Sequence, residues 1–337
     1  MLATRGGLDN LSDTGGRDSE KNDAIGVFGS SLAGSIVSCQ LSAGSSPPTH
    51  PPRGANAMAP WNGLIERLRP KSYGRKHPLI LINGLAEQHE SWFRNRRFWS
   101  RYFDVHTPNI LVYDGAALHR RIEKKEPITV DYLVDQLYLY VDQFVQNPPY
   151  HLVASSLGGK VAVEFAVRYP ELVDRVVLLC PSGMGDEEKL PIMEGVRKQD
   201  MYTVVKSVFH RTRTVDRDIV KYYKLAINSR KWKTGLLRTV RGTLEYTVRA
   251  KMKDVRAMTL LVTGDKDRIC DPATAEQAAH ELPNGHFLSI PNCGHAPQIE
   301  RHWLINRLVV HYLTAPNPTA KPRWTKLLLA KPTRASK

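Results

Sequence analysis

Short apolar runs alternate with helix-like segments along much of the chain, and this alternation restricts the fold more than any other feature. Continuous apolar runs are typical of strands buried on both faces, as in a parallel sheet covered by helices. Apolar residues at helical spacing between several of these runs indicate βαβ units. The strand-like runs are residues 79–83, 110–113, 150–154, 175–180, 258–263 and 286–290, and the helical patterns are 130–145, 159–168 and 299–313. The expected fold class is α/β.

The run at 150–154 leads directly into a serine that stands between small residues. The segment Ala154-Ser155-Ser156-Leu157-Gly158 matches the strand-to-helix turn Gly-x-Ser-x-Gly, with alanine in the first place. The backbone crowds itself in so sharp a turn, so only small residues fit around it. The hydroxyl of Ser156 then stands at the tip, above the positive end of a helix dipole. Taken alone, the segment also fits an ordinary strand–helix connection.

Two later segments supply the groups that a serine nucleophile needs. One buried-strand pattern ends in Gly264-Asp265-Lys266-Asp267, and the next ends in Cys293-Gly294-His295. A neutral hydroxyl is a poor nucleophile unless a base removes its proton, which is the role expected of His295. An acid that accepts a hydrogen bond from the other imidazole nitrogen fixes the tautomer, and Asp267 is one candidate for this role. Asp265, two residues away in the same loop, is the other candidate for the acid. It is alternatively only a solvated charge of the loop.

The chain order Ser156, Asp267, His295, with the motif Asn83-Gly84, resembles the α/β-hydrolase family over about residues 75–315. The resemblance implies an α/β-hydrolase fold, with a mostly parallel central sheet flanked by helices and an inserted helical cap. It also implies an oxyanion hole formed by the backbone N–H groups of Leu85 and Leu157. The family often carries His-Gly where this chain has Asn83-Gly84, which leaves the backbone donors intact.

Composition and the resemblance together divide the chain into five regions. The first is rich in Gly, Ser, Asp and Pro and is expected to be disordered. The regions are the disordered N-terminal region 1–60, the first part of the hydrolase core 61–181, a helical cap insertion 182–256, the second part of the core 257–316 and a basic C-terminal tail 317–337.

The net charge of +15 is concentrated in two of these regions. The cap contains 18 Lys and Arg against nine Asp and Glu, and the tail has six basic residues and no acid. A cationic cap and tail favour an anionic partner, either an acidic substrate or an anionic membrane surface touched peripherally. Alternatively, the charges of the cap lie only on its solvated face, the tail is disordered, and no anionic partner is involved. Nucleic acid is not expected, because no recognition motif accompanies the charge.

Neither a cofactor nor a metal is implied by the sequence. The four cysteines, at positions 39, 180, 270 and 293, lack metal-ligand spacing and are expected to be reduced thiols. A disulfide between the loops of Cys270 and Cys293 remains geometrically conceivable. A cytoplasmic protein, peripheral to the membrane, is the expectation. Export is the alternative, because Ile36-Val37-Ser38-Cys39 loosely resembles a lipoprotein cleavage site.

The expected activity is hydrolysis of a carboxylic ester, lipid-like or a small acyl ester, through an acyl-serine intermediate. Serine in the turn argues against the family's dehalogenases and epoxide hydrolases, which use aspartate there. Carbon–carbon bond hydrolysis, acyl transfer and perhydrolysis use the same three residues and remain alternatives. A non-catalytic binding protein with a hydrolase fold is a further alternative from a different class.

Overall fold

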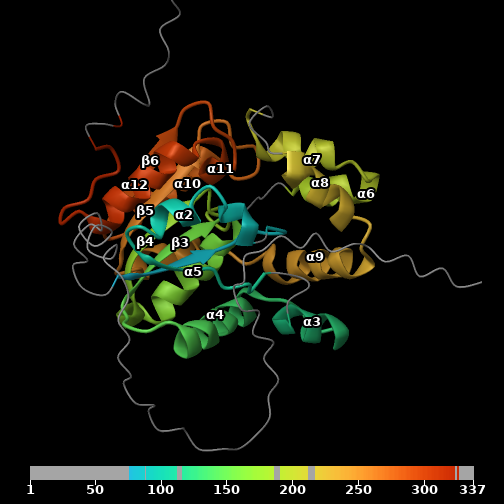
Figure 1. The fold of residues 1–337 in the computed structure, drawn as a ribbon, viewed down its shortest axis with the longest axis horizontal. Helices are drawn as coiled ribbons and strands as arrows, with labels where there is room; N and C mark the ends of the chain where they lie inside the picture. The colour runs from blue at the N-terminus through green and yellow to red at the C-terminus, as the bar shows by residue number, and fades with distance from the viewer. Residues whose placement is uncertain are drawn as a thin grey trace, which may run out of the picture. The chain divides into compact units, whose positions relative to one another are not determined.

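The computed structural model describes residues 76–87, 89–111, 116–185, 190–211, 217–322 and 325. The expected disordered region 1–60, and all of the basic tail except 317–322 and Thr325, lie outside the described residues. The described strands are β1 (Pro78–Ile82), β2 (Asp104–His106), β3 (Tyr150–Ser155), β4 (Val173–Leu179), β5 (Met258–Gly264) and β6 (Gly285–Ile290) (Figure 1).

Helices fill most of the connections between these strands. After β1 come η1 (His89–Trp92) and α2 (Arg96–Trp99), and after β2 come α3 (Ala116–Glu123) and α4 (Val130–Phe144). The later connections hold α5 (Leu157–Arg168), η2 (Pro170–Leu172), α6 (Pro191–Lys198), α7 (Met201–Val208), α8 (Arg217–Ala226), α9 (Arg230–Thr243), η4 (Arg249–Asp254) and α10 (Pro272–His280). The described part closes with α11 (Pro297–Glu300) and α12 (His302–Thr314).

The six described strands form one sheet in the order β2-β1-β3-β4-β5-β6, and every neighbouring pair is parallel. The register brings the carboxyl ends of adjacent strands together: Ile82 pairs with Ala154, and Ser155 pairs with Leu179. Gly264 pairs with Ile290 at the same edge. The loops after these strands therefore meet along one edge, where sheets of this kind place their sites. The predicted α/β class with a parallel sheet is confirmed.

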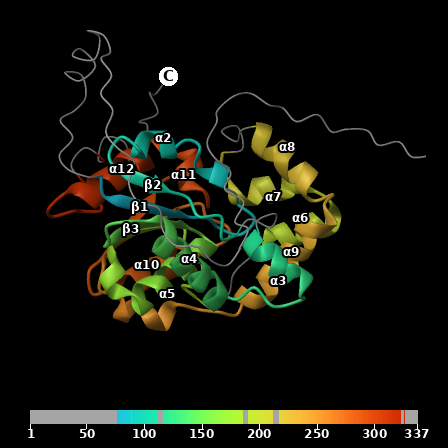
Figure 2. The same ribbon diagram turned by 60° about the horizontal axis from the view of Figure 1, so that its bottom comes forward.

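Alternate residues of each strand pack against two different helical layers, because successive strand side chains point to opposite faces. Leu79 and Leu81 belong to a buried cluster with Trp99 of α2 and Tyr312 of α12. Ile80 and Ile82 belong to the other cluster, which includes residues of α4, α5 and α10. Figure 2 shows the sheet between these two layers. Burial on both faces explains why the strands were readable as unbroken apolar runs.

The strand expected at 110–113 is wrong as far as the structure describes it. Ile110 and Leu111 are buried but lie in a turn, and the rest of the run is outside the described residues. The edge strand is Asp104–His106 instead, paired with β1 from Pro78↔Asp104 to Ile80↔His106. An edge strand is defined by its backbone pairing, and this one is partly exposed, so its side chains carry no apolar signal.

The helical patterns correspond closely to observed helices. The pattern at 130–145 is α4, whose first turn is capped by the side chain of Thr129 accepting from the Tyr132 N–H. The pattern at 159–168 is the body of α5. The pattern at 299–313 covers the end of α11 and nearly all of α12, which are separate helices.

Helices α6 to α9 lie between β4 and β5, within the segment proposed as the cap (Figure 1). Helix α3 lies beside α9 in this part of the molecule (Figure 2). The ammonium of Lys160, on α5, is buried and donates to the carbonyl oxygens of Thr243 and Leu244 at the end of α9. A cation at the negative end of a helix is favourable, so Lys160 stabilises the position of α9 against α5. Among the described residues, no helix has both the length and the apolar character needed to cross a bilayer.

Candidate active site

Ser156 stands at the junction of β3 and α5 in a backbone conformation that few residues adopt. Its φ is 49° and its ψ is −118°, which is a strained region for a residue with a side chain. The conformation is held by neighbouring backbone: the Ser156 N–H donates to Leu179 O at 3.0 Å, and its carbonyl accepts from Gly159 N at 2.8 Å and from Ser182 N at 3.1 Å. The turn expected from the sequence is therefore formed, with its serine at the tip.

Two glycines after Ser156 are required by close packing rather than by their dihedral angles. A Cβ on Gly158 would stand 2.6 Å from the carbonyl oxygens of both Ile82 and Asn83. A Cβ on Gly159 would stand 2.6 Å from the Cβ of Pro181. The first turn of α5 thus lies directly against the carboxyl ends of β1 and β4, as the small-residue pattern indicated.

His295 and Asp267 form a buried hydrogen-bonded pair. The Nδ1 atom of His295 lies 2.8 Å from Oδ2 of Asp267, and the two side chains are 6% and 0% exposed. The other carboxylate oxygen of Asp267 accepts from the N–H groups of Ile269 and Cys270 at 2.8 and 3.1 Å. These bonds fix the carboxylate in its loop and leave one oxygen directed to the imidazole.

The pKa of Asp267 is lower than its ordinary value although the group is buried. Burial by itself raises the pKa, and the charge and hydrogen bond of His295 and the two backbone N–H groups together outweigh it. Asp265 is placed differently: its carboxylate is partly exposed, lies 3.6 Å from the Lys266 ammonium and accepts weakly from the N–H of Cys293 at 3.4 Å. The structure brings Asp267, and not Asp265, to the histidine.

The loop after β1 lies against the serine turn. A Cβ on Gly84 would stand 3.0 Å from the Cβ of Ser156. Asn83 is buried, and its Oδ1 accepts from the indole N–H of Trp92 at 3.3 Å. Trp92 is fully buried in the core, so its hydrogen bond to Asn83 fixes the start of this loop. Leu85 and Leu157, the expected backbone donors, follow Gly84 and Ser156 directly in the sequence.

Four polar residues around the serine and histidine were missed by the sequence interpretation. Glu87 accepts from the N–H of Gly84, and Ser155 connects Glu87 to Gln298. Glu300 accepts from Gly294, beside the histidine, and from the N–H groups of two residues that follow α7. Ser155 stands in the turn motif, but the motif gave it no role, and Glu87, Gln298 and Glu300 stand in no local motif. Their position next to the catalytic loops became visible only in the folded chain.

The peptide group of His295 is joined directly to helix α7, within the segment proposed as the cap. Its N–H donates to the carbonyl oxygen of Val208, the last residue of α7, at 2.7 Å. A Cβ on Gly294 would stand 2.6 Å from both Val208 O and the His210 nitrogen. The loop that carries the histidine and the end of α7 therefore share direct backbone contacts, and the Glu300 carboxylate bridges the same two segments.

Cys180, Cys270 and Cys293 are buried free thiols around these loops. Burial raises the pKa of Cys180 well above its ordinary value, with a further rise from the nearby Asp267 carboxylate. The Sγ atom of Cys180 donates to Gly294 O at 3.8 Å. Its possible ligand atom lies within 4.8 Å of those of Asp267 and His295, but a protonated thiol and an imidazole already bound to a carboxylate are poorly suited to a metal ion.

A second group of possible metal ligands lies at the opposite edge of the sheet. His77, His151 and Asp174 stand at the amino-terminal ends of three adjacent strands, with ligand atoms within 4.8 Å of one another. The two imidazole rings pack against each other in a tilted arrangement, with centroids 3.9 Å apart and 31° between their planes. The cluster is that of a packed histidine pair beside a carboxylate.

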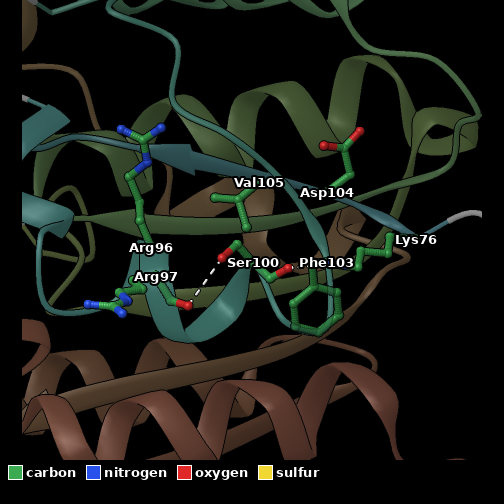
Figure 3. A pocket seen from close by; sticks show the side chains of 7 residues that line it. All are labelled: Lys76, Arg96, Arg97, Ser100, Phe103, Asp104 and Val105. Atoms are coloured by element: carbon green, nitrogen blue, oxygen red, sulfur yellow. Dashed lines mark hydrogen bonds between the residues drawn. The ribbon is translucent and has the colours of Figure 1, made fainter. Parts of the chain in front are cut away.

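A hollow of about 500 Å³ opens near β2 and α2. It is lined by Lys76, Arg96, Arg97, Ser100, Phe103, Asp104 and Val105 (Figure 3). None of these residues belongs to the loops of Ser156, Asp267 or His295, and most are exposed. The hollow is thus separate from the candidate active site.

Comparisons with known proteins agree with this geometry. The model of the alpha/beta hydrolase family matches residues 79–307. Monoacylglycerol lipase ABHD6 of Bos taurus is 20% identical over 266 residues, covering 73% of this chain and 78% of the relative. A 2-hydroxy-6-oxononadienedioate/2-hydroxy-6-oxononatrienedioate hydrolase of Comamonas testosteroni is 27% identical over 178 residues, 48% of this chain and 62% of the relative.

Solved structures show the same fold. Naproxen esterase of Bacillus subtilis superposes with a TM-score of 0.58 at 19% identity, covering 73% of this chain and 85% of the esterase. At this identity the likeness concerns the fold and leaves the substrate open. The match of the family model over most of the chain, on a sheet that places serine, aspartate and histidine loops at one edge, shows that this chain belongs to the alpha/beta hydrolase family.

Proposed function

We propose that this chain is a serine hydrolase that cleaves carboxylic esters through an acyl-serine intermediate. Ser156 is the nucleophile, His295 the general base and Asp267 the residue that orients the imidazole. The observation that carries the proposal is the buried bond between His295 and Asp267 at the sheet edge where Ser156 stands at a strained turn. Strained backbone is retained at sites where it serves a function.

In the first step His295 takes the proton of the Ser156 hydroxyl as the oxygen attacks the ester carbonyl. The imidazolium that forms is stabilised by the Asp267 carboxylate, which accepts a hydrogen bond from the Nδ1–H group. His295 then returns the proton to the departing alcohol, and an acyl-serine remains. Water, activated by the same histidine, attacks the acyl group and restores the serine.

Negative charge on the carbonyl oxygen is stabilised by backbone donors in the proposed oxyanion hole. Leu157 is the first residue of α5, so its N–H is among those that lack a partner within the helix. Leu85 follows Gly84, which lies against Ser156. One such donor contributes about 3 kcal/mol in the transition state.

Covalent labelling with a fluorophosphonate probe tests the proposal. Peptide mapping is expected to find the label on Ser156, and the label is expected to be lost in Ser156→Ala and strongly reduced in His295→Ala. A screen of p-nitrophenyl esters of increasing acyl length then measures substrate preference. A folded wild-type chain that takes up no label would overturn the proposal and favour the binding-protein alternative.

Carbon–carbon bond hydrolysis is the second candidate, because hydrolases of dienoate substrates are among the relatives. The same three side chains serve both reactions, so geometry does not separate them. The two are separated by turnover: a 2-hydroxy-6-oxo-dienoate cleaved faster than every simple acyl ester would favour the second candidate. Ester turnover without dienoate cleavage favours the first.

Peripheral contact with an anionic membrane is a finer part of the proposal. Large apolar side chains are exposed on or just after the described cap helices: Tyr202 54%, Leu225 64%, Leu237 48% and Leu244 41%. Leu225 stands on α8 with exposed Lys221 and Lys224 beside it in the sequence. Apolar side chains among basic ones are typical of helices that lie in a membrane interface.

Co-sedimentation with vesicles of phosphatidylcholine, with and without phosphatidylserine, tests this contact. Leu225→Ser is expected to weaken binding to the anionic vesicles, and Leu139→Ser, on the exposed face of α4, serves as the matched control. A chain that ends at Pro316 measures the contribution of the tail. Equal sedimentation of all variants with both vesicles would exclude the proposed contact.

A further inference from the structure

The carboxylate of Glu87 contacts Gly84, three residues earlier in the loop that carries Leu85. Its Oε2 accepts from the N–H of Gly84 at 3.0 Å, and its Oε1 accepts from the hydroxyl of Ser155 at 3.2 Å. The contact with Gly84 is close, because a Cβ there would stand 3.1 Å from the Glu87 carboxyl carbon. One side chain thus holds the residues that immediately precede Leu85 and Ser156.

The same connection continues to the loop of His295. Ser155 is fully buried, and its Oγ accepts from Nε2 of Gln298 at 3.1 Å. Gln298 is also fully buried and lies in α11, three residues after His295. Its backbone carbonyl accepts from Nδ2 of Asn95 at 3.2 Å, which fixes α11 in turn. The chain Glu87–Ser155–Gln298 therefore joins the loop after β1, the end of β3 and helix α11 through hydrogen bonds that are buried or partly buried.

We infer that Glu87 is a positioning residue that holds the oxyanion loop and the serine strand in register through its hydrogen bonds to Gly84 and Ser155. This rests on the proposed serine hydrolase function for its catalytic consequence, and the geometry itself does not depend on it. Asp267 is bonded to Nδ1 of His295 and orients the ring, whereas Glu87 holds the loop that carries Leu85.

Hydrogen exchange of the Gly84 amide tests the contact without any substrate. Glycine-selective ¹⁵N labelling and NMR follow this amide in wild type, Glu87→Ala and the control Glu171→Ala, an exposed glutamate in η2. Loss of the Glu87 acceptor is expected to speed exchange at Gly84 about tenfold or more, and the control is expected to leave it unchanged. An unaltered exchange rate in Glu87→Ala would overturn the inference.

Labelling of Ser156 tests the positioning part. The rate constant for the fluorophosphonate is expected to fall about tenfold or more in Glu87→Ala, because the Gly84 N–H then lacks its acceptor. Glu87→Gln, which keeps an acceptor, is expected to recover most of that rate. Equal rates in wild type and Glu87→Ala would overturn the positioning role. If wild type takes up no label, the serine hydrolase function fails, and the amide exchange still decides whether Glu87 holds the loop of Gly84.

Discussion

His295 Nδ1 and Asp267 Oδ2 lie 2.8 Å apart although 28 residues separate them in the chain. The end of β5 packs closely against the loop after β6 that carries His295, since a Cβ on Gly264 would stand 2.3 Å from the carbonyl oxygens of Cys293 and Gly294. A bond of this kind, removed from solvent at both partners, sets the tautomer of the imidazole.

Asp267→Asn is expected to lower kcat for ester hydrolysis by about 10³- to 10⁴-fold, because the amide can hold the wrong tautomer. The measurement is kcat against pH, with the melting temperature of each variant determined alongside. Asp265→Asn is the matched control, since Asp265 is partly exposed and does not contact the histidine. An Asp265 variant as impaired as the Asp267 variant would reverse the assignment of the acid.

Gly158→Ala is expected to destabilise the fold by about 1–3 kcal/mol, because its Cβ meets two backbone oxygens that have little room to move. Urea unfolding measures this. Gly84→Ala is the instructive comparison, since its Cβ meets the side chains of Ser156 and Glu87 at 3.0 and 3.1 Å. There the stability change is expected to be smaller and the loss of Ser156 labelling larger. The opposite ranking would contradict the packing described.

The unfolding free energy is expected to fall on acidification because of His151. Burial first, and then the charges of His77 and Arg175, lower the pKa of His151 to about 3. As the pH falls below 6.5, the unfolded chain binds a proton that the folded chain does not, so stability decreases toward pH 3. The loss is on the order of 3 kcal/mol by pH 4.

Urea midpoints at pH 4.5 and 7.5 in wild type and His151→Gln measure this acid sensitivity. The variant is expected to show a smaller difference between the two midpoints. His119→Gln is the control, because His119 is partly exposed and paired with Glu123 on the surface. Asp174 faces the same ring, with its Oδ2 3.4 Å from Nδ1 of His151. Identical differences in all three proteins would contradict the expected proton uptake.

Glu300→Ala is expected to lower both stability and Ser156 labelling. The carboxylate accepts from Gly294 and His210 at 2.8 and 2.9 Å and from Arg211 at 3.1 Å. An unsatisfied buried N–H costs about 1–3 kcal/mol, and these donors join the histidine loop to the chain after α7. Thermal unfolding and the labelling rate measure the effect, with Glu276→Ala, exposed on α10, as the control. An unchanged labelling rate in Glu300→Ala would contradict the expected effect of this carboxylate on the candidate active site.

The sequence by itself determined the features that depend on local backbone chemistry. Small residues around Ser156 predicted the turn, the buried runs predicted five of the six described strands, and the order of Ser156, Asp267 and His295 indicated the family. These signals are readable because a sharp turn and a doubly buried strand each restrict the residues at a fixed spacing.

Only the tertiary structure decided which distant groups meet. The edge strand at Asp104–His106 replaced the apolar run near Ile110, because strand identity there depends on pairing with β1 and not on side-chain polarity. Glu87, Gln298 and Glu300 likewise lack any local motif. Their roles come from hydrogen bonds between loops that the parallel register brings to one edge, and long-range contacts of this kind leave no periodic signal in the sequence.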